Sequence, residues 1–237
     1  MKSLLIIGGS GLVGTSLIKL ACNSMNVFFT YNNNPFKTSK AKGSFINLLN
    51  NDGSISKLIK SICPDVVVNT AAYQNVDYCE ERPDMANLLH VKSTEEISLA
   101  CLDTSSKLIH FSSNFVFDGK KGFYNENDSP NPISHYGKTR LDAEKIVLKK
   151  SSQNVVLRTT VIYGWHKNSK FTNFVLKQLK NNLNVNAFTD QYGNPTLADD
   201  LASCIMKIIS TNTNGLFNAV GKSCVNRYEF AKNIAEK

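Results

Sequence analysis

A tyrosine and an arginine stand four residues apart in the segment HYGKTR, residues 135–140. Pro132 and Ser134 precede them and apolar residues recur afterwards, which is the pattern of a helix start. Tyr136 and Arg140 would then share one helix face, so that the hydroxyl and the guanidinium can converge. A nearby cation favours the phenolate and makes a phenol, with its ordinary pKa of about 10, a usable proton donor near neutral pH. Taken alone, the segment also fits an amphipathic helix with an ordinary surface tyrosine, and the residues that precede it favour the chemical interpretation.

A glycine-rich loop, GGSGLVG at 8–14, follows a short apolar run and opens a helical pattern. Gly9, Gly11 and Gly14 satisfy the GxGxxG spacing, and Gly8, Gly11 and Gly14 satisfy the related GxxGxxG spacing. Glycine at these positions allows a tight turn and lets a pyrophosphate approach the backbone at the start of the helix. In this strand–turn–helix context the loop predicts dinucleotide binding, and the alternative is a plain glycine turn.

The end of the second expected strand bears on the choice of cofactor. An acidic residue that binds a ribose 2′-hydroxyl is expected about 20 residues after the glycine loop. Residues 29–34 read FTYNNN and contain no acid, and Lys37, Lys40 and Lys42 follow. The pattern therefore favours a 2′-phosphate and NADP(H), with NAD(H) as the alternative.

Short apolar runs alternate with helical periods along the first two thirds of the chain. Strands are expected at 3–7, 26–30, 65–69, 107–112 and 154–159, and helices at 11–23, 52–62, 83–103 and 134–150. This alternation predicts an α/β fold with a doubly wound parallel sheet. The second part should contain helices at 171–182, 198–210 and from 226, strands at 184–188 and 215–220, and a loop at 190–197. We expect a dinucleotide-binding domain at 1–163 and a smaller substrate lobe at 164–237, with some of its elements returning to the first domain.

The composition excludes several classes of protein. No run approaches the roughly 20 apolar residues that a membrane-spanning helix needs. The six cysteines form no CxxC pair or metal-spaced cluster, which predicts reduced thiols in a cytoplasmic protein and no metal site. The net charge of +8 is spread thinly over the chain, which argues against a nucleic-acid partner and suits an anionic small ligand.

Seven stretches together resemble the extended short-chain dehydrogenase/reductases, and more narrowly the dTDP-4-dehydrorhamnose reductase family. They are GGSGLVG (8–14), PDVVVNTAAYQNVDYCE (64–80), HFSSNFVFDG (110–119), YGKTRLDAE (136–144), LRTTVIYG (157–164), NFV (173–175) and DQYGNPTLADDLA (190–202). The resemblance covers essentially the whole chain and implies a Rossmann domain. A sister branch, the regulatory beta subunit of methionine adenosyltransferase, shares several of these stretches.

The resemblance implies roles for particular residues. Tyr136 would protonate the substrate carbonyl, Arg140 would support it electrostatically, and Ser113 would hydrogen-bond the carbonyl oxygen. The implied cofactor-binding residues are Gly8, Gly11, Leu12, Val13, Gly14, Tyr31, Asn32, Asn47, Leu48, Ala71, Ala72, Tyr73, Ser112, Tyr136 and Arg140. The implied substrate-binding residues are Val76, Ser113, Asn114, Trp165 and Asn173. The plainer alternatives are that Ser112 and Ser113 satisfy backbone groups at a strand end, and that Ala71 and Ala72 are small packing residues.

The chain departs from the family pattern at several positions. Arg140 stands where the family has lysine, and His90 stands where relatives have asparagine, which favours a satisfied core histidine over a catalytic one. Val161 occupies the place of a substrate-stacking tryptophan, for which Trp165 could substitute. The family's last elements, which help to shape the sugar-nucleotide pocket, have no counterpart in these residues.

We expect NADP(H)-dependent reduction of a 4-keto sugar linked to dTDP. The alternatives are a regulatory subunit with relaxed catalysis, and a reductase or epimerase for another nucleotide sugar. The identity of the sugar and a homodimeric state are left open.

Overall fold

A parallel sheet of seven strands forms the centre of the computed structural model, which describes residues 1–35 and 38–236. The strands are β1 (Ser3–Ile7), β2 (Asn26–Tyr31), β3 (Lys42–Phe45), β4 (Val66–Asn69), β5 (Lys107–Ser113), β6 (Val155–Thr159) and β10 (Gly215–Asn218). Their order in the sheet is β10-β6-β5-β4-β1-β2-β3, and every neighbouring pair is parallel. The strand order reverses between β1 and β4, and the connections that leave the carboxyl ends of these two strands run to opposite faces of the sheet. In such folds this is the place where a ligand binds.

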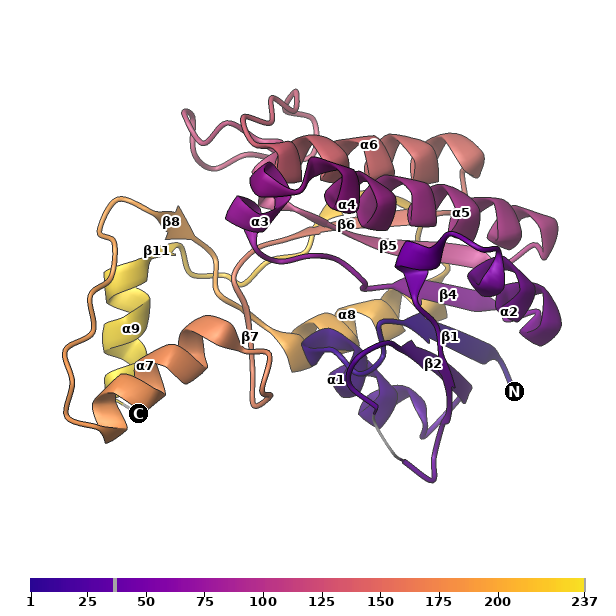
Figure 1. The fold of residues 1–237 in the computed structure, drawn as a ribbon, viewed down its shortest axis with the longest axis horizontal. Coiled ribbons are helices and arrows are strands. Elements are labelled where there is room, and N and C mark those ends of the chain that lie inside the picture. Colours follow the sequence, from indigo (N-terminus) through magenta and orange to yellow (C-terminus); the bar gives the residue numbers. More distant parts are fainter. Residues whose placement is uncertain (36–37, 237) are drawn as a thin grey trace.

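Helices cover both faces of the sheet (Figure 1). On one face lie α1 (Leu12–Ala21) and α8 (Ala198–Thr211), and on the other lie α2 (Ser54–Ile62), α5 (Ser93–Asp103) and α6 (His135–Lys150). A hydrophobic core lies on each face of the sheet, and successive residues of a strand point alternately into one core and the other. In β1, Leu4 and Ile6 pack towards α1 and α8, whereas Leu5 and Ile7 pack towards α2 and α5. The expected doubly wound α/β fold is confirmed.

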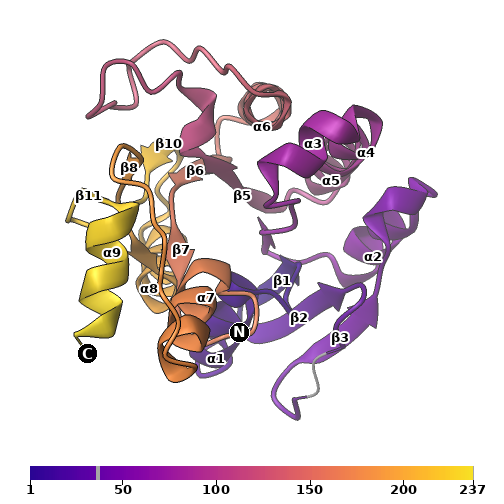
Figure 2. The ribbon, with the colours of Figure 1, turned by 60° about the vertical axis from the view of Figure 1, so that its left-hand side comes forward.

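A smaller lobe lies beyond the carboxyl ends of the strands (Figure 1). It contains α7 (Lys170–Lys180), α9 (Arg227–Ala235) and the short strands β7 (Ile162–Tyr163), β8 (Tyr192–Gly193), β9 (Thr196–Leu197) and β11 (Val225–Asn226). Figure 2 shows α7 and α9 side by side, and the Phe171 and Phe230 rings stack between them with centroids 5.6 Å apart. The later elements α8 and β10 belong instead to the central sheet and its cover.

Several local features differ from the sequence-based expectations, among them the predicted loop at 190–197, which contains the short strands β8 and β9. Strand β3 and helix α3 (Val76–Glu81) were not expected, and the helix predicted at 83–103 consists of α4 (Pro83–Asn87), a π-helical turn at Leu88–Lys92 and α5. The strand predicted at 184–188 is wrong: the segment forms no strand, and the carbonyl of Phe188 accepts a hydrogen bond from the amide of Tyr228, at the start of α9, at 3.0 Å. Within the described ranges, no helix combines the length and apolar character needed to cross a bilayer.

Candidate active site

The glycine loop lies at the carboxyl end of β1 and leads directly into α1. The amide of Gly9 donates to the carbonyl of Thr30 at 2.8 Å, which fixes the loop against β2. A Cβ atom on Gly14 would lie 2.6 Å from the carbonyl oxygen of Gly8, so only glycine lets α1 approach the loop this closely. No side chain caps α1 and no acid stands in its first turn, so its first amides are available to an anion. The cradle fits the phosphates of a dinucleotide.

Helix α6 begins one residue before Tyr136. The hydroxyl of Ser134 caps the helix by accepting a hydrogen bond from the amide of Gly137 at 3.1 Å. Gly137 then allows close contact with the turn after β5, since a Cβ there would overlap the carbonyl oxygen of Phe115. The first turn of α6 is therefore held directly against the end of β5.

This contact brings the predicted proton donor and carbonyl donor into one neighbourhood. The rings of Tyr136 and Phe115 meet edge to face, with centroids 5.4 Å apart. The hydroxyl of Ser113 accepts a hydrogen bond from the amide of Phe115 at 3.2 Å. Ser113 thus satisfies a backbone group, as the plainer alternative predicts, and its own hydroxyl proton has only a long contact of 3.4 Å to the side-chain oxygen of Asn114. That proton can be redirected to a substrate oxygen.

His90 connects the segment after β4 to α6. Its Nε2 accepts the amide proton of Tyr73 at 3.0 Å, and its Nδ1 lies 2.9 Å from the hydroxyl of Thr139. Because Thr139 donates its own proton to the carbonyl of Tyr136 at 2.9 Å, Nδ1 of His90 must carry the proton of this contact. Burial, followed by the charges of Arg140 and His135, lowers the pKa of His90 to about 2. His90 is therefore a neutral, satisfied histidine whose ring lies 5.6 Å from that of Tyr136.

Arg140 lies one helical turn after Tyr136 on α6 and is only 3% exposed. Its Nη2 donates to the carbonyl of Phe111 on β5, and its Nε and Nη1 have no hydrogen-bond partner among the described residues. Burial lowers the pKa of this guanidinium, whereas its attraction to Tyr136 and to Glu144 raises it. In this position Arg140 influences Tyr136 mainly as a buried charge.

A buried ion pair supports the same region. Arg158 on β6 donates to Glu144 on α6 through Nη2 at 2.7 Å and through Nε at 3.0 Å. The hydroxyl of Ser112 donates to the same carboxylate, so the position predicted to bind cofactor is engaged with α6. One carboxylate thus lies near two buried guanidinium groups, those of Arg158 and Arg140.

The remaining predicted cofactor residues lie along the carboxyl edge of the sheet. The side-chain amide of Asn32 donates to the side-chain oxygen of Asn47 at 3.4 Å, which joins the segments after β2 and β3. Tyr31 packs against Phe45, and Leu48 starts the short 3-10 turn at Leu48–Asn50.

After β4, the amide of Ala71 donates a hydrogen bond to the side-chain oxygen of Asn69. The half-buried Ala72 and Tyr73 follow, and Val76 is the first residue of α3. Lys37 lies outside the described residues.

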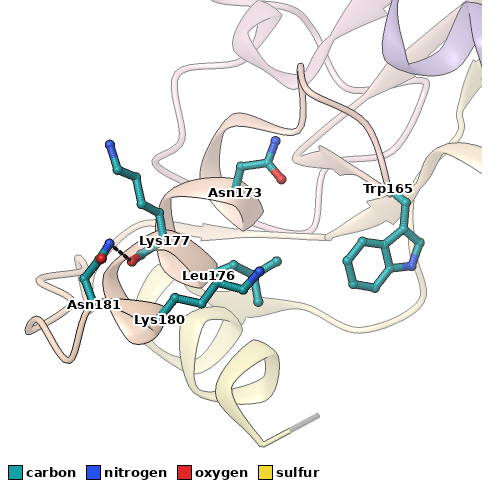
Figure 3. Close-up of a pocket in the computed structure, with 6 residues that line it drawn as sticks. All are labelled: Trp165, Asn173, Leu176, Lys177, Lys180 and Asn181. Atoms are coloured by element: carbon teal, nitrogen blue, oxygen red, sulfur yellow. Dashed lines mark hydrogen bonds between the residues drawn. The ribbon is translucent and has the colours of Figure 1, made fainter.

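Two predicted substrate residues line a shallow pocket of about 430 Å³ on the small lobe. Trp165 is 92% exposed. Its indole surrounds the pocket together with Asn173, Leu176, Lys177 and Lys180 of α7 and with Asn181, which follows the helix (Figure 3). The side-chain amide of Asn173 donates to the carbonyls of His166 and Lys167, at 2.8 and 3.1 Å. Asn173 therefore fixes the loop that carries Trp165. Asn114 is exposed next to Ser113.

Several residues of this region were missed by the sequence-based reasoning. Glu144, Arg158 and Thr139 act through contacts between different elements, and no local pattern marks them. Gly137 could have been singled out because a glycine directly after Tyr136 is unusual at a helix start. Its close approach to the carbonyl oxygen of Phe115, however, depends on the tertiary position of Phe115. Lys177 and Lys180 could have been found from their spacing with Asn173, which places all three on one side of a helix.

Comparisons with known proteins agree with this geometry. The family model described as the RmlD substrate binding domain matches residues 1–237. A dTDP-4-dehydrorhamnose reductase of Aggregatibacter actinomycetemcomitans is 31% identical over 238 residues, which cover 98% of this chain and 77% of that protein. The match to the same-named protein of Salmonella typhimurium, also 31% identical, covers 76% of this chain and 62% of that protein, so the chain spans only part of such relatives. Methionine adenosyltransferase 2 subunit beta of Xenopus laevis is 31% identical over 98% of this chain and 71% of that protein.

Solved structures show the same fold. A hypothetical dTDP-4-dehydrorhamnose reductase from Sulfolobus tokodaii superposes with a TM-score of 0.90 at 31% identity, covering 100% of this chain and 82% of that one. The Bacillus anthracis reductase, solved in complex with NADP, has a TM-score of 0.85 at 23% identity over 100% of this chain and 81% of its own. The chain therefore belongs to the RmlD substrate binding domain family, the reductase family that its sequence motifs predicted.

Proposed function

We propose that this protein uses NADP(H) to reduce the 4-keto group of a nucleotide-linked deoxysugar, with dTDP-4-dehydrorhamnose as substrate and dTDP-L-rhamnose as product. The observation that carries the proposal is the position of Tyr136. It lies one helical turn before the buried cation Arg140, with which it interacts electrostatically, and its ring packs against Phe115 in the turn that follows Ser113. Relatives with this name, and a neighbouring structure that holds NADP, support the same assignment.

The cofactor site is supported by the glycine cradle and by the residues after β2 and β4. The amides at the start of α1 and the close packing at Gly14 suit a pyrophosphate. A reduced nicotinamide dinucleotide bound here would supply the hydride. Tyr73, held by His90, and Ala71, held by Asn69, would border the nicotinamide end of the site.

The chain's own residues would handle the proton. Ser113 would turn its hydroxyl from Asn114 to the substrate carbonyl oxygen and so polarise it. Tyr136 would donate its phenolic proton to that oxygen as the carbonyl carbon is reduced, and the resulting phenolate would be stabilised by the positive charge of Arg140. Because Arg140 is buried, water screens its charge only weakly.

The lobe pocket supports a nucleotide sugar as the substrate class. The exposed indole of Trp165 offers a flat surface for a sugar or a base, and Lys180, whose side chain extends towards that indole, offers a positive charge to a phosphate. Asn173 holds the Trp165 loop in place and so prepares this surface.

Purified protein with NADPH and dTDP-4-dehydrorhamnose should consume the cofactor, followed by loss of absorbance of the reduced nicotinamide. Tyr136→Phe removes the proton donor while keeping the ring contacts with Phe115 and His90. We expect kcat to fall by about two orders of magnitude or more, the usual contribution of a general acid. Tyr228→Phe, at a half-exposed position of α9, is the matched control and should retain activity. Equal activity of Tyr136→Phe and the control would contradict the proposal.

A second candidate is a dinucleotide-binding regulatory subunit with relaxed catalysis. The observation that favours it is the burial of Arg140, whose Nη2 is engaged with the Phe111 carbonyl. The relationship to methionine adenosyltransferase 2 subunit beta agrees with it. Tight NADPH binding without turnover, together with a stoichiometric protein partner, would favour this candidate. Arg140→Lys separates the two, because restored or increased turnover in that variant would mark the arginine as an impaired family lysine.

A further inference from the structure

Lys167 reaches from the small lobe to the end of β2. Its Nζ lies 2.7 Å from the side-chain oxygen of Asn34, a residue 133 positions earlier in the chain. Asn34 lies three residues after the end of β2, close to where dinucleotide-binding folds distinguish the two forms of the adenosine ribose. A cation from one lobe is thus placed near the end of β2 in the other.

The charges around this contact leave the ammonium free for an anion. Residues 1–51 contain no aspartate or glutamate, so no carboxylate of β1, α1, β2 or β3 competes for it. Among the described residues, Lys167 forms no ion pair, and its partner Asn34 is neutral. Burial, followed by the positive charges of Lys167 and Lys19, lowers the pKa of His166, so Lys19 of α1 is a second cation in this neighbourhood.

The loop that carries Lys167 is held by its own hydrogen bonds. The side-chain amide of Asn173 donates to the Lys167 carbonyl at 3.1 Å, and the buried hydroxyl of Ser169 accepts from the amide of Gly164 at 3.2 Å. The same loop carries Trp165, which lines the lobe pocket. Cofactor recognition and the substrate pocket are therefore connected through one short segment.

We propose that Lys167 binds the 2′-phosphate of NADP(H) and is the residue that makes this protein prefer NADP(H) to NAD(H). An ammonium is a strong point donor to phosphate, and at this position it brings a cation from the second lobe to the end of β2, which carries no acid. The inference rests on the proposed function only in assuming a dinucleotide site at the glycine loop. It adds a residue that neither the motifs nor the strand order indicate.

Isothermal titration of the full chain with NADP⁺ and NAD⁺ tests the proposal without requiring turnover. Lys167→Met should weaken NADP⁺ binding by about tenfold or more, equivalent to about 1.4 kcal/mol, and leave NAD⁺ binding within about twofold. Lys167→Arg should keep most of the preference. Lys170→Met removes a neighbouring lysine of the same loop–helix junction and serves as the control for general charge.

The outcomes separate this proposal from the function itself. Lys167→Met that keeps the full NADP⁺ preference would overturn the role of Lys167 and leave the reductase function standing, as would an equal loss in Lys170→Met. A wild-type protein that prefers NAD⁺ would have the same consequence. Failure to bind either dinucleotide would overturn both proposals.

Discussion

Replacing Glu144 with glutamine would remove the one carboxylate that faces two buried guanidinium groups. The side chains of Glu144 and Arg158 are 3% and 4% exposed and lie 2.7 Å apart. The glutamine would keep the shape of the side chain and could still accept the Ser112 hydroxyl, but the negative charge would be gone. Arg158 and the nearby Arg140 would then be buried cations without a counter-charge.

The burial of the pair sets the size of the effect. Exposed ion pairs contribute roughly 0–1 kcal/mol, whereas removing one partner of a buried pair costs about 3–5 kcal/mol, because the other charge is left unpaired away from water. Two nitrogens of Arg140, Nε and Nη1, already lack an acceptor among the described residues. No nearby acceptor is therefore available to replace the charge of Glu144. We therefore expect Glu144→Gln to lower the free energy of unfolding by about 3–5 kcal/mol.

Urea denaturation followed by circular dichroism measures this change. With a slope of about 3 kcal/mol per molar, the midpoint should fall by about 1 M or more. Asp142→Asn is the matched control on the same helix: its carboxylate is 56% exposed, it lies 3.4 Å from Lys145, and its loss should cost less than about 1 kcal/mol. If Glu144→Gln were no more destabilising than Asp142→Asn, the view of this pair as an essential buried charge would be wrong.

Two further predictions concern stability and the start of α6. Burial lowers the pKa of His90 to about 2 and that of His110 well below its ordinary value, so below a pH of about 6.5 only the unfolded chain takes up these protons. The free energy of unfolding should therefore fall by about 2 kcal/mol per histidine between pH 7 and pH 5. Urea titrations at both pH values should show that His90→Asn removes about half of this loss. An unchanged pH dependence in this variant would refute the assignment. Gly137→Ala should destabilise the protein by about 1–3 kcal/mol and reduce turnover, because the new Cβ would overlap the carbonyl oxygen of Phe115. The control Lys138→Ala, at an exposed position of the same turn, should change neither property. Thermal melts and NADPH consumption measure the two effects, and a Gly137→Ala variant with unchanged stability and turnover would show that α6 can move away from Phe115.

The boundaries were predicted well for the elements whose local sequence pattern matches the burial of their residues in the folded protein. Strand β1 and helix α6 are examples, because a buried run ends in glycines and a Ser134 cap precedes a periodic apolar face. Strand β3 carries no such pattern: its four residues are KGSF, and it forms because β2 offers an edge and Phe29 covers Gly43. The π-helical turn that carries His90 likewise depends on contacts made by residues distant in the chain.

The sequence by itself determined the family, the doubly wound sheet and the pair Tyr136 and Arg140, because glycine spacing, strand–helix alternation and helix periodicity are local properties of the chain. The tertiary structure decided what surrounds that pair. Contacts such as Lys167 with Asn34, or Arg158 with Glu144, join elements that only the order of the strands and the placement of the lobe bring together. The tertiary structure also decided which side chains are buried. Arg140 could have stood at the surface of its helix, but it is buried against Phe111 of β5, where its charge is weakly screened.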